Sequence, residues 1–168
     1  MIRLKNVLVA TDLGEPAGVA LTYGRELART FGATLHVLYV APDLAGNFGA
    51  VSGSASAGDV SGLQAEMEDA ARIRLDDLLS DEDRNVLRAR PTLIRSSANP
   101  AHVIARHAAD VNADVIVIGT HSRTGVAHFL MGSVAERVVR IAPCPVLTVR
   151  HPEHEFVLPD ALQTTAHT

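Results

Sequence analysis

One stretch of the sequence, residues 115–139, combines a buried strand, a glycine-containing loop and the start of a helix. It reads VIVIGTHSRTGVAHFLMGSVAERVV. Four apolar residues run into Gly119, Gly125 lies in the loop that follows, and Gly132 and Ser133 open an amphipathic segment. Backbone N–H groups in such a loop and at a helix N-terminus are suited to hold a phosphate. The segment therefore predicts a strand–loop–helix unit with a small-molecule site at its loop.

Strands and helices alternate along the rest of the chain. Continuous apolar runs are typical of strands that are buried on both faces of a parallel sheet. Between them lie segments with helical periodicity, where Gly32 marks a helix end and Asn99–Pro100 a helix start. Pro91 cannot donate to a ladder, which places its strand at a sheet edge. We expect strands at residues 7–10, 34–40, 86–94, 115–118 and 145–149, and helices at residues 17–31, 63–79, 100–110 and from 133 to the prolines at 143 and 145.

This alternation predicts a doubly wound α/β fold with a parallel sheet. In such sheets a ligand binds outside the carboxyl ends of the strands, where the direction of winding reverses. Asp12 follows the first expected strand and Gly119 ends the fourth. Residues 1–150 are expected to form one domain. Residues 42–62, rich in Gly, Ser and Ala, are expected to form a flexible loop, and residues 151–168 a loosely held tail.

Composition argues against several functions. The net charge is −4 and no long run of Lys or Arg occurs, which argues against nucleic-acid binding. No apolar stretch approaches the roughly 20 residues of a membrane span. A single cysteine, Cys144, and the lack of a signal-peptide pattern predict a cytoplasmic protein. The eight histidines show neither the i, i+4 pair nor the Cys/His cluster expected of zinc, so no metal site is expected.

Three segments together resemble the universal stress protein family over residues 4–150. The entry KNVLVATDLGEPA is similar to the first strand and Asp-bearing turn of that family, and SVAERVVRIAPCPVLTVR to its last helix and strand. The nucleotide motif of the family is Gly, two residues, Gly, nine residues, then Gly-Ser or Gly-Thr. Gly119 and Gly132–Ser133 match its ends at the right spacing, whereas Ser122 replaces the second glycine.

The resemblance implies an open five-stranded parallel sheet of order 3-2-1-4-5 with helices on both faces, like the adenine nucleotide alpha-hydrolases. It also implies a homodimer formed through the last strand, Pro145 to Val149, and a regulatory role in the stress response rather than an enzymatic one. Members of the family divide into those that bind ATP and those that do not. ATP, with Mg²⁺ as a further candidate, is therefore the expected cofactor.

The expected nucleotide site has structural alternatives at most positions. Asp12 would meet a ribose hydroxyl or Mg²⁺, or only make an Asx-turn. Val40 would pack on an adenine ring, or only fill the core. Ser133 with Glu136 could form a capping box, and Gly119 could serve a tight turn. The candidate cofactor-binding residues are Asp12, Val40, Gly119, Ser122, Arg123, Gly132, Ser133 and Val134.

Three functions remain after other nucleotide-binding patterns are excluded. The chain has neither GxxxxGK[ST] nor GxGxxG after its first strand, and it lacks the acidic pair and the Lys of a receiver domain. The leading hypothesis is an ATP-binding homodimeric regulator with an unknown protein partner. The alternative is a member without nucleotide that acts as an interaction module through its dimer surface, which Ser122, Gly14 and Ala98 favour. A slow ATPase ranks last.

Overall fold

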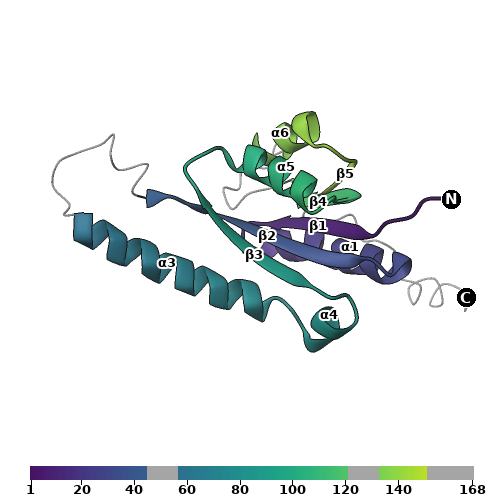
Figure 1. Ribbon diagram of the computed structural model, residues 1–168, viewed down its shortest axis with the longest axis horizontal. Coiled ribbons are helices and arrows are strands. Elements are labelled where there is room, and N and C mark those ends of the chain that lie inside the picture. The colour runs from purple at the N-terminus through teal and green to yellow at the C-terminus, as the bar shows by residue number, and fades with distance from the viewer. Residues whose placement is uncertain (45–56, 121–132, 151–168) are drawn as a thin grey trace, which may run out of the picture.

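Five strands form a single parallel sheet in the order β3-β2-β1-β4-β5 in the computed structural model (Figure 1). The structure describes residues 1–44, 57–120 and 133–150. The predicted fold class and strand order are confirmed. The strands are β1 (Asn6–Thr11), β2 (Thr34–Pro42), β3 (Arg90–Ser96), β4 (Val115–Gly119) and β5 (Val146–Val149). The helices are α1 (Glu15–Phe31), α3 (Ala57–Asp77), α4 (Asp81–Asn85), α5 (Pro100–Asp110) and α6 (Ser133–Ile141).

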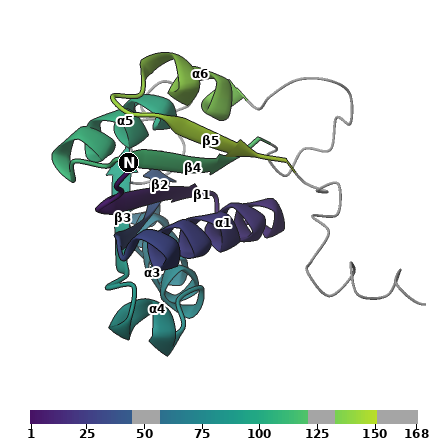
Figure 2. The ribbon, with the colours of Figure 1, turned by 90° about the vertical axis from the view of Figure 1, so that its right-hand side faces the viewer.

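Helices cover both faces of the sheet. Figure 2 shows α5 and α6 on one face and α1, α3 and α4 on the other. Alternate residues of a strand point to opposite faces. Val7 and Val9 of β1 accordingly join the apolar cluster under α1 and α3, whereas Leu8 and Ala10 join the cluster under α5 and α6. Both faces of β1 are buried, which explains its uninterrupted apolar sequence.

Two glycines, Gly24 within α1 and Gly32 directly after it, have distinct structural reasons. Gly32 ends the helix in the left-handed conformation, with φ of 63°, as predicted from its position. Gly24 allows the helix to approach β1 closely, because a Cβ built there would lie 2.2 Å from Cγ2 of Val9. The helix begins at Glu15, two residues before the predicted start, because Pro16 fits its first turn.

The segment after β2 contains more regular structure than the sequence indicates. The strand continues to Pro42, and α3 already begins at Ala57 instead of residue 63, so the expected loop at 42–62 was too long. Gln64 is buried and ties the two elements together: its Oε1 accepts from the Leu44 amide at 2.8 Å and its Nε2 donates to the Pro42 carbonyl at 3.2 Å. A helix anchored at Gln64 can extend toward its N-terminus through weak helix formers, since propagation is less costly than nucleation.

The region before β3 was assigned wrongly from the sequence. A strand was expected at residues 86–94, but it spans Arg90–Ser96, and the short helix α4 was missed. Ser80 caps α4: its hydroxyl accepts from the Asp83 amide, and the Asp83 carboxylate accepts from the Ser80 amide. The capping box thus uses Asp where Glu or Gln is usual. The edge position of β3 that Pro91 predicted is confirmed.

The helix starts expected on the other face of the sheet are largely confirmed. Asn99 caps α5 by accepting from the Ala101 amide at 3.0 Å, and Pro100 is its first residue. Helix α6 is described from Ser133, the expected start, and the Ser133–Glu136 capping box stays a prediction. The Glu136 carboxylate accepts from Arg140 at 2.9 Å. The expected tail at 151–168 lies outside the described residues.

Candidate functional site

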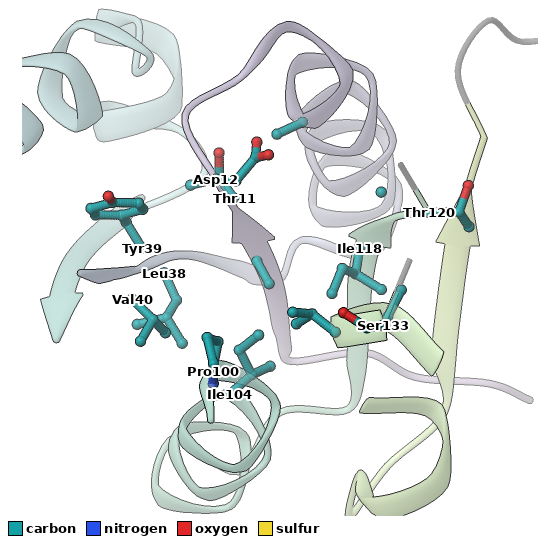
Figure 3. Close-up of a pocket in the computed structure, with 15 residues that line it drawn as sticks. Thr11, Asp12, Leu38, Tyr39, Val40, Pro100, Ile104, Ile118, Thr120 and Ser133 are labelled. Carbon is teal, nitrogen blue, oxygen red and sulfur yellow. The ribbon is translucent and has the colours of Figure 1, made fainter. Parts of the chain in front are cut away.

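A pocket of about 240 Å³ opens at the carboxyl ends of β1, β2 and β4 (Figure 3). The parallel register brings these ends together: Val7 of β1 pairs with Leu35 of β2 and with Val115 of β4. The chain leaves β1 toward α1 on one face of the sheet and leaves β4 toward α6 on the other. The pocket thus lies where the direction of winding reverses, at the place that the fold class predicts for a ligand.

One end of the pocket is apolar. Leu38 and Val40 of β2 face Pro100 and Ile104 of α5 across the pocket, and Ile118 of β4 lies nearby (Figure 3). Leu38 and Ile118 point to the same face of the sheet, since both residues belong to the cluster under α5 and α6. A flat apolar group, such as a nucleobase, suits a wall of this kind.

The other end of the pocket is polar. Asp12 is exposed, and its Oδ1 accepts from the Gly14 amide at 2.9 Å, which is the expected Asx-turn. Thr11 supports the same turn: its Oγ1 accepts from the Leu13 amide at 3.0 Å, and Leu13 takes a left-handed φ of 60°. The turn between β1 and α1 therefore has a fixed shape, and Asp12 lines the same pocket as Gly119.

The N-terminus of α6 also reaches the pocket. Ser133, Val134 and Ala135 of its first turn line the cavity. The first amides of a helix have no partner within the helix, and the helix dipole adds a partial positive charge there. A phosphate group placed at this end would receive N–H donors and a favourable field.

The structure brings five of the eight candidate residues to this one pocket: Asp12, Val40, Gly119, Ser133 and Val134. The other three, Ser122, Arg123 and Gly132, lie outside the described residues. Val40 does not end β2, as expected, but precedes its end by two residues. Sequence reasoning missed Tyr39, Thr11 and Thr120, which are neighbours of the predicted strand-end residues, and the α5 wall of Pro100 and Ile104.

Two kinds of feature are absent from the described part of the chain. Within residues 1–44, 57–120 and 133–150, no group of three or more His, Cys, Asp or Glu side chains is arranged to hold a metal ion. Across the same residues, no helix combines the length and the apolar character that crossing a membrane requires.

Comparison with known proteins gives a consistent result. The model of the universal stress protein family matches residues 3–150. A universal stress protein of Methanocaldococcus jannaschii is 27% identical over 161 residues, which cover 90% of this chain and 85% of that protein. The solved structure of the universal stress protein UspA from Lactobacillus plantarum is 26% identical, with a TM-score of 0.67 over 89% of this chain and all of that one.

Two further solved structures with the same fold contain adenine nucleotides. One is the universal stress protein from Archaeoglobus fulgidus in complex with dAMP, which is 22% identical with a TM-score of 0.55, over 88% of this chain and 98% of that one. The other is a universal stress protein in complex with cAMP, 19% identical with the same TM-score, over 89% of this chain and 98% of that one. At these identities the comparison establishes a shared fold.

Proposed function

Since the chain belongs to the universal stress protein family, we propose that it binds an adenine nucleotide in the pocket at the carboxyl ends of β1, β2 and β4. The observation that carries the proposal is the convergence of three separate segments on one cavity. The turn after β1 supplies Asp12, β2 and α5 supply the apolar wall, and the end of β4 with the start of α6 supplies Gly119 and Ser133. The dAMP and cAMP complexes of two relatives support the choice of ligand class.

The base and the phosphates would occupy opposite ends of the pocket. The adenine would lie between Val40 and Ile104, where the walls are apolar. The phosphates would lie toward Gly119 and the N-terminus of α6. We propose ATP as the nucleotide, because the spacing of Gly119, Gly132 and Ser133 in the sequence resembles the nucleotide motif of the family. The exposed Asp12 carboxylate is a suitable ligand for an accompanying Mg²⁺.

The residues that line the pocket support binding rather than turnover. Asp12 is the one carboxylate among the described residues that line it, and neither a histidine nor a lysine joins it there. Hydrolysis of a phosphoanhydride needs positioned groups that activate water and stabilise the developing charge. We therefore propose a regulator of the stress response that works in the cytoplasm, whose nucleotide state is read by a protein partner, with at most slow ATPase activity.

ATP with Mg²⁺ is expected to raise the melting temperature of the protein. A ligand at a hundred times its Kd stabilises the native state by about 2.7 kcal/mol, which corresponds to roughly 5–10 °C for a chain of this size. Gly119→Val is expected to abolish the shift, because its side chain would enter the phosphate end of the pocket. Differential scanning fluorimetry with ATP, AMP and GTP measures the effect.

A matched control uses the same substitution at a distance from the pocket. Gly62 lies in α3, and a Cβ added there meets nothing within 4 Å. Gly62→Val should therefore retain the full ATP-dependent shift. No shift at millimolar ATP for the unmodified protein would instead favour the alternative, an interaction module that works without nucleotide.

We also propose that β5 pairs with β5 of a second copy. The strand lies at the sheet edge, where Val146, Leu147 and Thr148 are only partly buried. The neighbouring helix α6 leaves Val139 and Ile141 about 46% and 40% exposed. An edge strand beside exposed apolar side chains is a surface suited to pairing with another chain.

Thr148→Pro is expected to convert the dimer to a monomer. The Ile116 amide donates to the Pro145 carbonyl and the Thr120 amide to the Val149 carbonyl. Residues alternate in direction along a strand, so the Thr148 N–H points away from β4, and its loss leaves the β4–β5 ladder intact. Light scattering after size-exclusion chromatography measures the mass, with Thr148→Ser as the control that keeps the N–H. A dimeric Thr148→Pro variant would contradict pairing through β5.

A further inference from the structure

Two histidines lie where α5 packs on the sheet, His36 buried and His107 half-buried. His36 of β2 is 5% exposed, and its Nε2 lies 3.2 Å from Oδ1 of Asn6. The side-chain amide of Asn6 donates to the Asn112 carbonyl at 3.3 Å, so Oδ1 is the acceptor and His36 Nε2 carries a proton. His107 of α5 has a buried Nε2, for which the described part of the chain provides no hydrogen-bond partner.

The surroundings of the pair favour uncharged rings. Burial lowers the pKa of His36 from 6.5, and the positive charges of Arg90 on β3 and of His107 lower it further. Burial likewise lowers the pKa of His107, while Asp110 on the same helix opposes the change. From β1, the neutral amide of Asn6 faces His36. An imidazolium at His107 would carry a buried Nε2–H without an acceptor, which is strongly unfavourable.

Both histidines belong to the two elements that form the apolar wall of the pocket. Along β2, His36, Leu38 and Val40 are alternate residues and share one face. Along α5, Pro100, Ile104 and His107 recur at helical spacing. Leu38, Val40, Pro100 and Ile104 line the pocket (Figure 3). The packing of α5 against β2 around the histidines therefore continues directly into the two sides of the proposed adenine site.

We propose that proton uptake by His36 and His107 weakens nucleotide binding, so that the pocket releases its ligand on acidification. The inference rests on the proposed function. A charged His107 would lie near His36, with its Nε2 buried. The simplest relief is a movement of α5 away from β2, which separates Leu38 and Val40 from Ile104 and Pro100. A bound nucleotide requires these walls to stay together.

The coupling must act in both directions. If the protonated protein binds nucleotide about fivefold more weakly, then bound nucleotide must lower the histidine pKa by about 0.7 unit. The direction of the pH dependence follows from the pKa values of the two histidines, which are lowered from 6.5. The form with both rings neutral is fully populated above pH 6.5. It is lost as the pH falls below 6.5 through the pKa of the folded state.

Nucleotide affinity at two pH values tests the coupling. Isothermal titration calorimetry measures the Kd of AMP at pH 7.5 and at pH 5.0. Between these two pH values, the Kd of the unmodified protein is expected to rise about fivefold more than the Kd of His107→Leu. Protonation of the AMP phosphate is common to both proteins and cancels in this comparison. Leucine fills the half-buried position without titrating. His102→Leu, on the exposed side of the same helix, is the matched control and should behave as the unmodified protein.

The outcomes separate the two proposals. Absence of AMP and ATP binding at pH 7.5 would overturn the proposed function and the coupling with it. Binding whose pH dependence is the same in His107→Leu and the unmodified protein would overturn the coupling alone. An NMR titration of the histidine Cε1–H signals in the unmodified protein needs no variant. There, saturating AMP should lower the pKa of His36 or His107, and unchanged pKa values for both would also reject the coupling.

Discussion

Replacing Arg25 by methionine is expected to lower the free energy of unfolding by about 3 kcal/mol at neutral pH. Arg25 joins α1 to α4 through Asp83, whose side chain is only 2% exposed. The Arg25 Nε donates to both carboxylate oxygens at 2.9 and 3.0 Å, and its guanidinium also donates to the Leu78 carbonyl at 2.5 Å. Methionine keeps most of the apolar contact of the side chain but leaves a buried carboxylate without its cation.

The loss should depend on pH. Burial alone would raise the pKa of Asp83, but hydrogen bonds from Arg25 and Ser80, with the charge of Arg25, outweigh it and hold that pKa below 3.8. The ion pair therefore stabilises the fold fully above pH 3.8, and this contribution is lost as the pH falls through the lower pKa of the folded state. The difference between variant and unmodified protein should shrink accordingly in acid.

Urea unfolding at pH 7 and pH 3 measures both effects, and Arg29→Met provides the control. Arg29 also lies on α1 and contacts Glu26 and Glu82, but all three side chains are more than 40% exposed. Pairs of this kind contribute about 0.2–1 kcal/mol. Similar losses for Arg25→Met and Arg29→Met would show that burial of Asp83 does not govern the energetics.

Gly24→Ala is expected to destabilise the protein by about 2 kcal/mol, although alanine is the better helix former. The added Cβ would lie 2.2 Å from Cγ2 of Val9, and Val9 is fully buried, so α1 must move away from β1. Gly18 lies in the same helix, and a Cβ there meets nothing within 4 Å. Gly18→Ala should therefore stabilise the protein by about 0.5–1 kcal/mol.

A double-mutant cycle isolates the contact between helix and strand. Val9→Ala removes the methyl group that the new Cβ would meet. In that background Gly24→Ala should be nearly neutral, which gives a favourable coupling energy of about 1–2 kcal/mol in thermal or urea unfolding. Independent, additive effects of the two substitutions would refute close packing of α1 on β1 as the reason for this glycine.

Local signals with a simple physical cause were readable from the sequence. The left-handed residue at Gly32, the cap at Asn99 and the edge strand with Pro91 were all predicted from the residue alone and are confirmed. The strand order came from the family resemblance, since a periodic pattern does not specify which strands are neighbours. Helix α4 was missed because its five residues have no apolar periodicity and its stability depends on Arg25, 58 positions away from Asp83.

The site was predictable where it lies at strand ends. Asp12 and Gly119 stand in the sequence at the ends of apolar runs, which mark them as strand-end residues. The fold class then predicts that they lie at one pocket. Ile104 was not predictable, because a helical apolar residue looks the same whether it faces the core or a cavity. The start of α3 depends on a buried glutamine that contacts the end of β2, which is a tertiary contact that propensity does not record.

The central position of β1 has a consequence for biosynthesis. Its N-terminal end is held by Asp114, whose carboxylate accepts from the Lys5 amide across 109 positions, and β1 pairs along one side with β4. A nascent chain can therefore pair β1 with β2 early. The side of β1 that pairs with β4 stays unpaired until residues 115–119 leave the ribosome. An exposed apolar strand edge of this kind invites aggregation. Translation arrest before residue 115 would thus yield fragments that depend on chaperones.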